Sequence, residues 1–222
     1  MLHVTNHINL NWNLKWFFGC LNTYGAKRLF VKILIMKVKG TILTSIQGFV
    51  KENFPNRYQE WIDQLSVDSK GLFTKTIMAT EWYDYQDGLV KPSELVSSLF
   101  YNNDIKKSAW EIGRYSAEVG LKGIYKVFVL IATPQFIMKR GGKILASFYE
   151  PSVLTIGTER PKGVDIHVTE FPDPSEVAEN RIAGWMEKAL EICGVTNITI
   201  ELTESLLKGN DKTVYTINWE KK

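Results

Sequence analysis

The chain contains few side chains of the types that do chemistry, and their spacing matches no catalytic motif. Residues 36–222 hold a single histidine, His167. It alternates with Ile166 and Val168 in a strand-like run, so we expect it to face away from the apolar side of that strand. The GxSxG turn of a nucleophilic serine is missing, and so are the GxxxxGK[ST] and GxGxxG loops that hold phosphates. The sequence therefore predicts no catalytic residue and a protein that is not an enzyme.

Two acidic pairs and two cysteines have to be considered as metal or redox sites. Asp84 with Asp87, and the similar pair Glu201 with Glu204, lie among hydrophilic neighbours, which favours solvated faces. Cys20 and Cys193 are far apart and belong to no CxxC motif. Cys193 reads as a small core residue at a helix end, and a dyad with His167 would require a tertiary contact. We predict no metal site, no disulfide and a reducing, cytoplasmic location.

A surplus of aromatic residues indicates a site of another kind, a pocket for a small apolar ligand. Such pockets are mostly apolar and carry only a few polar groups. The aromatic residues fall on or beside the predicted helices in the middle of the chain, where they could also fill a solid core. The candidate pocket residues are Trp82, Tyr83, Tyr115, Phe128, Phe136, Phe148 and Tyr149.

The elements that would position these side chains are three successive helices between Asp104 and Pro151. Asp104 can cap the first helix, and Gly120 can end it. The second, residues 121–132, is apolar nearly all round, which is typical of a buried helix. Thr133-Pro134 then provides a capping hydroxyl followed by a proline at the first helical position, which predicts a third helix up to Phe148.

After Pro151 the hydrophobic period changes from that of a helix to that of strands. Residues 153–158 and 164–169 predict a hairpin. Residues 173–176 have the spacing of a capping box and open a helix that ends at Gly194, with Ile182 and Trp185 facing the core. Two more strands follow, at 198–203 and 213–219. The predicted fold class is α+β, N-terminal helices followed by a ββαββ unit with a four-stranded antiparallel sheet.

Residues 1–35 differ from the rest of the chain. They carry four basic residues and no acid, so residues 36–222 keep 23 of the 27 bases against 24 acids. That near-neutral balance argues against nucleic-acid binding by the folded part. The uncharged run Trp16–Ala26 has eleven residues, fewer than the ~20 that a membrane span needs. We predict an N-terminal extension outside the fold and a single domain over 36–222; a short membrane-surface segment is the alternative for 1–35.

Five parts of the chain are distinctive when taken together: MKVKGTI at Met36–Ile42, WYDYQDG at Trp82–Gly88, EIGRY at Glu111–Tyr115, the helix Pro134–Phe148 and the closing helix with its hairpin. They resemble the corresponding parts of the haem nitric-oxide/oxygen-binding (H-NOX) domain superfamily. The opening run is similar to that family's start, which supports Met36 as the beginning of the domain. The last part, IELTESLLKGNDKTVYTINW, is also similar to 4-vinyl-reductase-type ligand-binding domains, which share the fold with tethering subunits of Golgi transport.

The resemblance implies a haem-based sensor, but the chain departs from the family where haem is held. Haem-binding members carry an axial histidine on the helix that corresponds to Pro134–Phe148, and Pro134–Tyr149 contains none. Their Tyr-x-Ser-x-Arg trio is also missing, since YEPSV stands at Tyr149–Val153. Met138 and Tyr149 are the nearby alternatives as iron ligands, and both read better as packing residues.

The prediction is therefore a small-ligand sensor domain without haem, with an apolar ligand and a signalling protein or a second copy as partner. The alternative is a protein–protein interaction or tethering module of the same fold, with a filled or lipid-holding core. A large apolar cavity would favour the first, and a filled core with an exposed apolar patch the second.

Overall fold

The computed structural model describes residues 35–121 and 133–220 of the chain. Contacts divide the chain at Met36, and the residues from Met36 onward form one compact unit. The predicted helix over 121–132, with the candidate Phe128, lies outside the described residues apart from Leu121. Within the described ranges, no helix combines the length and the apolarity that crossing a membrane requires.

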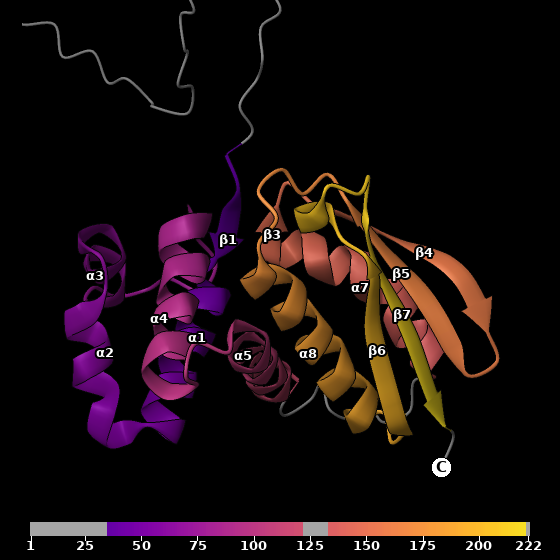
Figure 1. Cartoon of the computed structure of the whole chain (residues 1–222), viewed down its shortest axis with the longest axis horizontal. Coiled ribbons are helices and arrows are strands. Elements are labelled where there is room, and N and C mark those ends of the chain that lie inside the picture. Colours follow the sequence, from indigo (N-terminus) through magenta and orange to yellow (C-terminus); the bar gives the residue numbers. More distant parts are fainter. Residues whose placement is uncertain (1–34, 122–132, 221–222) are drawn as a thin grey trace, which may run out of the picture. The chain divides into compact units, whose positions relative to one another are not determined.

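The first half of this unit is mainly helical. Figure 1 shows helices α1 to α4 together on one side of α5. Trp61 is fully buried among them, and its ring contacts Phe73 edge to face. The elements are β1 (Lys37–Lys39), α1 (Gly40–Asn53), a 3-10 turn (Pro55–Arg57), α2 (Tyr58–Gln64), α3 (Val67–Phe73), β2 (Trp82–Asp84), a π-helical turn (Gln86–Val90), α4 (Lys91–Phe100) and α5 (Ile105–Gly120).

The second half carries a four-stranded antiparallel sheet in the order β4-β5-β7-β6, which confirms the predicted fold class. Helix α7 packs on β4 and β5, and α8 packs on β6 (Figure 1). The elements are α7 (Pro134–Phe148), β3 (Tyr149–Glu150), β4 (Val153–Arg160), β5 (Gly163–Thr169), α8 (Glu176–Ile192), β6 (Thr196–Glu204), a 3-10 turn (Leu206–Lys208) and β7 (Thr213–Glu220).

A second, smaller sheet is absent from the sequence-based prediction. Strand β1 pairs with β2 on one side and with β3 on the other, both antiparallel. Strands of two or three residues are too short to show a period of two, so the alternation that reveals the larger sheet cannot reveal this one. The small sheet matters for the site because it fixes Tyr149 opposite Val38.

Side-chain caps set the beginnings of the central helices. Asp104 accepts a hydrogen bond from the Lys107 amide at 2.9 Å, and Thr133 accepts one from the Phe136 amide at 3.2 Å, as the sequence predicts. For α8 the predicted cap is wrong. Ser175, not Asp173, accepts from the Ala178 amide at 3.1 Å, and Asp173 instead accepts from Gln86 Nε2 at 2.7 Å.

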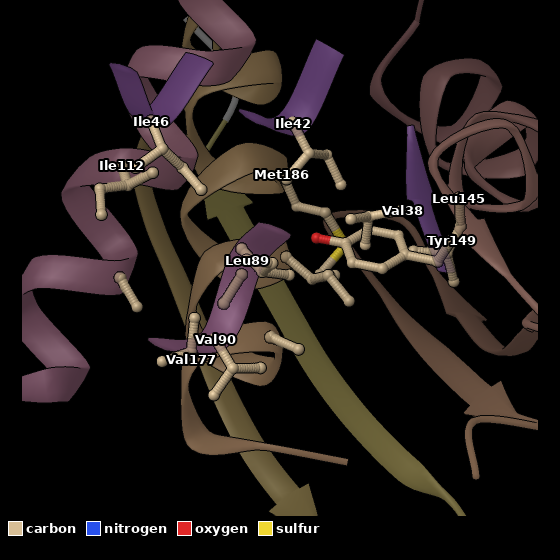
Figure 2. Packing of buried hydrophobic residues seen from close by; sticks show 14 of the residues in the cluster. Val38, Ile42, Ile46, Leu89, Val90, Ile112, Leu145, Tyr149, Val177 and Met186 are labelled. Carbon is tan, nitrogen blue, oxygen red and sulfur yellow. The ribbon is translucent and has the colours of Figure 1, made fainter. Parts of the chain in front are cut away.

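Helices α5 and α8 approach closely because each has a glycine at the crossing. A Cβ on Gly113 would collide with the carbonyl oxygen of Arg181, and a Cβ on Gly184 with that of Trp110. The core runs across this contact without interruption, from the helical half to the sheet. Figure 2 shows core residues from three helices: Ile46 of α1, Ile112 of α5 and Val177 of α8.

Candidate ligand cavity

A cavity of about 380 Å³ lies beside helices α1, α5, α7 and α8 and the inner face of the sheet. Most of the described wall is apolar. The described residues that line it are Thr41 and Ile42 of α1, Ser116 and Gly120 of α5, Met138, Ile144, Leu145 and Phe148 of α7, Tyr149 of β3, Leu154 of β4, Ile166 of β5, and Arg181, Ile182, Trp185 and Met186 of α8. The volume and the apolar wall are those of a small-molecule site.

The junction between α7 and β3 supplies two neighbouring aromatic side chains. Phe148 is the last residue of α7 and is half-buried, whereas Tyr149 begins β3 and is 2% exposed. The Tyr149 ring packs against Phe171, with ring centroids 5.6 Å apart. In Figure 2 the Tyr149 hydroxyl points toward the Met186 side chain of α8.

The polar part of the wall is built around Arg181. Its side chain is buried, with 3% of the residue exposed. Nη1 donates to the Tyr149 hydroxyl at 3.1 Å, and Nη2 donates to the hydroxyls of Ser45 at 2.8 Å and Ser116 at 3.0 Å. Nε is buried and has no hydrogen-bond partner in the described part of the chain. One positive charge thus lies among three neutral hydroxyls at the edge of an apolar cavity.

The structure places the seven candidate pocket residues in different surroundings. Phe148 and Tyr149 line the cavity, and Phe128 lies outside the described residues. The remaining four, Trp82, Tyr83, Tyr115 and Phe136, are not in the described wall.

Each of these four side chains has other contacts that explain its position. The Trp82 ring lies under Lys39 Nζ at 3.9 Å, and the Tyr83 hydroxyl accepts from the Met78 amide at 2.9 Å. Tyr115 packs against Phe49, although its neighbour Ser116 lines the cavity, because successive helical residues point about 100° apart. Phe136 is 49% exposed on the outer side of α7.

Other chemistry-bearing residues take structural positions. His167 packs over Gly157 of β4, and because side chains alternate along β5 it faces away from Ile166 and the cavity. Burial raises the pKa of the Cys193 thiol to about 11, which leaves little thiolate at neutral pH. Asp84 accepts from the amide of Asp87, whose carboxylate pairs with Lys91 at 2.7 Å. Among the described residues no group of three or more His, Cys, Asp or Glu could hold a metal ion.

Sequence reasoning missed Arg181, and missed Met186 and Ser116 as wall residues. Ile182 and Trp185 could be assigned to the core face of α8 from their spacing, but Arg181 precedes them on a helix with several charged residues. Arginine is almost never fully buried unless it is paired, so a surface position is the natural expectation. The available signal was the small residue Gly184 three positions later, which lets α5 come close enough to cover that face.

Comparison with known proteins identifies the fold through solved structures, whereas sequence comparison identifies no family. No protein-family model and no curated protein matches the chain. Among solved structures, an H-NOX protein from S. oneidensis in the Fe(II)NO state is 14% identical, with a TM-score of 0.63 over 82% of this chain and 99% of that one.

Two further solved structures agree with that match. The Fe(II) unliganded H-NOX protein from K. algicida is 14% identical, with a TM-score of 0.61 over 83% of this chain and 97% of that one. A point mutant of T. tengcongensis H-NOX is 11% identical, with a TM-score of 0.60 over 82% and 97%. Likenesses at this level of identity establish architecture, and they agree with the resemblance of the sequence motifs: the chain has the H-NOX fold.

Proposed function

We propose that this domain is a sensor or carrier domain whose cavity binds a small apolar ligand without haem. The observation that carries the proposal is the cavity of about 380 Å³ between α1, α5, α7, α8 and the sheet. A close-packed core would contain few voids larger than a water molecule. The apolar wall of a pocket that large contacts water when no ligand is bound, so a ligand that covers the wall is stabilised by the burial of that apolar surface.

The donor set of the wall supports a ligand other than haem. Haem iron is held by a strong axial ligand, a histidine, cysteine, methionine or tyrosine. No imidazole or thiol belongs to the described wall, whose candidate donors are the thioethers of Met138 and Met186 and the hydroxyl of Tyr149. That hydroxyl already accepts from Arg181, and the ring is packed between Phe171 and the cavity. The wall therefore does not fit haem in the manner of the family.

A neutral fluorescent probe tests whether the cavity accepts a ligand. We expect aminoanthracene to bind the full chain in a 1:1 complex with a rise in fluorescence. An apolar cavity of ~150 Å³ already holds benzene, and this cavity is about 2.5 times larger. It should therefore accept aminoanthracene, which has about fifteen heavy atoms. Leu154→Trp adds an indole at the wall and should abolish the complex. The matched control Leu207→Trp, on the exposed turn after β6, should leave it unchanged. An absence of binding to the wild type would contradict the proposal.

A haem titration tests the second half of the proposal. Haem added to the purified chain should give no sharp Soret band that saturates near one equivalent. A tight complex that is lost in Tyr149→Phe or in Met138→Leu would show that one of these residues is an axial ligand, and the haem-free proposal would be wrong.

The alternative function is an interaction or tethering module, which a contiguous exposed apolar patch would favour. The exposed large apolar residues of the described chain are Ile35, Val67, Met78, Val119, Phe136 and Leu207.

A further inference from the structure

Arg181 is a buried cation for which the described protein supplies no counter-ion. All 24 aspartate and glutamate residues lie within the described ranges, because residues 1–34, 122–132 and 221–222 contain none. None of the ion pairs among the described residues includes Arg181. The nearest groups that accept its hydrogen bonds are the neutral hydroxyls of Ser45, Ser116 and Tyr149.

The cavity wall also contains polar hydrogens that have no acceptor among the described residues. A guanidinium has five N–H donors, and the three bonds to hydroxyls use three of them. The Nε–H is one of the two left over in the described part of the chain. Ser45 donates its own proton to the Ile42 carbonyl, but within the described ranges no acceptor faces the hydroxyl protons of Ser116 and Tyr149. Unpaired donors and a permanent charge therefore meet at one end of the cavity.

Burying such a group is unfavourable unless a negative charge joins it. A guanidinium stays charged, so it cannot escape the cost of burial by losing a proton. An unpaired buried charge costs several kcal/mol, and a buried pair recovers that cost only with good geometry and further hydrogen bonds. Because the described residues give neither a carboxylate nor a full set of acceptors, the missing anion is most simply a part of the ligand.

Charge and shape select the kind of anion. A carboxylate carries one negative charge, which balances Arg181, and its oxygens can accept a charge-assisted hydrogen bond from a guanidinium N–H together with hydrogen bonds from neighbouring hydroxyls. A phosphate monoester carries about −1.5 to −2 charges and would bring a surplus into a wall with one cation. Apart from Thr41, the rest of the described wall is mainly apolar, with Ile42, Leu145 and Ile166 among its residues. Scaled from the benzene-sized cavity, its volume suits about fifteen heavy atoms.

We propose that the cavity ligand is a monocarboxylic acid with an apolar body, and that its carboxylate pairs with Arg181 and accepts from Ser116 and Tyr149. The proposal rests on the proposed function, since it concerns the same cavity. The ligand is thereby oriented: its carboxylate lies beside Ser116 of α5, Arg181 of α8 and Tyr149 of β3, and its apolar body lies against the apolar residues of α7 and the sheet.

The test compares an acid with the alcohol of the same chain. Dodecanoic acid and dodecanol, each below its aggregation limit, are titrated into the full chain by calorimetry at neutral pH. The wild type should bind the acid at least about tenfold more tightly, as charge-assisted hydrogen bonds imply. Arg181→Met should remove this preference and leave the affinity for the alcohol within about threefold. The control Arg140→Met removes an exposed arginine, outside the described wall, and should change neither affinity.

The outcomes separate this inference from the function on which it rests. If the alcohol binds the wild type as tightly as the acid, both here and in the second pair of compounds described below, the cavity is a ligand site and the acid inference is wrong. If neither compound binds and aminoanthracene does not bind either, the proposed function itself is wrong. Should Arg181→Met fail to fold, Arg181→Lys keeps the charge and should retain the preference for the acid in weakened form. If Arg140→Met abolishes the preference for the acid as fully as Arg181→Met does, the preference comes from charge on the protein surface, and the inference is wrong.

A second pair, naphthylacetic acid and naphthylethanol, asks which apolar body the cavity accepts. A larger preference for the dodecyl pair indicates a flexible chain as the natural body, and a larger one for the naphthyl pair indicates a rigid ring system. A preference for the acid within either pair supports the inference, and its absence from both contradicts it.

Discussion

At the scale of single residues, some side chains of the cavity wall can be identified from the sequence and others cannot. Phe148 and Tyr149 could be predicted because they end an apolar helix that begins with a recognisable cap. Arg181 could not, because its burial results from the close approach of α5 and not from its own neighbours in the sequence. The buried charge in the cavity wall thus depends on tertiary packing, whereas the aromatic residues at its edge follow from a pattern within one segment of the sequence.

Because Phe148 borders the cavity, we expect its change to alanine to lower the free energy of unfolding only slightly. A buried phenylalanine changed to alanine loses ~3–5 kcal/mol of unfolding free energy in a filled core, because lost burial adds to a new void. Phe49, 4% exposed and packed against Phe54 and Tyr115, should follow that rule. Phe148 already borders a void, so Phe148→Ala should cost less than Phe49→Ala in urea denaturation of the unliganded protein. An equal loss would show that the wall around Phe148 is close-packed.

The Arg160–Asp165 pair on the hairpin predicts a dependence of stability on pH. The Arg160 guanidinium donates to Asp165 at 2.8 Å and holds the pKa of that carboxyl below its usual range. A lowered pKa in the folded state means that this stabilisation is present above the pKa of the unfolded chain, about 4, and is lost as the pH falls through the folded value. Asp165→Asn should therefore cost up to about 1 kcal/mol at pH 7 and nothing at the acid end of the range. A cost that does not change with pH would rule out the ion pair as its cause.

At the scale of elements, regular and long segments were predictable and short ones were not. The bounds of α5 and α7 follow from their caps and from Gly120, and the four long strands follow from alternation. Strands β1, β2 and β3 span three residues or fewer, which is below what a pattern can show. Nor does a capping pattern say which of two neighbouring acceptors is used, as Asp173 and Ser175 illustrate. Those choices depend on partners distant in the sequence, here Gln86.

The crossing of α5 and α8 should be sensitive to one added methyl group. Gly184→Ala would place a Cβ against the Trp110 carbonyl, so the helices must separate, at a cost of ~1–3 kcal/mol or more. The control is Gly71→Ala on α3, where no atom lies within 4 Å of the added Cβ and where alanine should stabilise the helix by up to ~1 kcal/mol. Chemical denaturation of both variants measures the difference. Equal effects would mean that the two helices are not in close contact.

At the scale of the whole molecule, the order of elements was enough to predict an α+β fold, and the motif resemblance pointed to the H-NOX architecture that the structural comparisons show. The cavity itself was not predictable. The same aromatic residues could have filled a core, and whether they do depends on how four helices meet a sheet. Of the aromatic candidates, Tyr115 and Phe136 point elsewhere for reasons that only the packing supplies.

The division of the chain at Met36 predicts the result of a truncation. The described unit has its own core, from Met36 to Trp219. A chain that begins at Met36 should therefore melt within about 2 °C of the full chain in a thermal scan, since a loss of ~1 kcal/mol lowers the melting temperature of a domain of this size by about 2–4 °C. A larger loss would show that residues 1–35, with Trp12 and Trp16, contribute to the core.

Native mass spectrometry of the full chain, purified from its own host without added ligand, shows whether the cavity holds a ligand in the cell. We expect a species heavier than the chain by the mass of one small organic molecule, and loss of that species in Leu154→Trp but not in Leu207→Trp. A mass increase that corresponds to haem would contradict the haem-free proposal. If the chain carries no added mass and the cavity also rejects both dodecanoic acid and aminoanthracene, the cavity is not a ligand site.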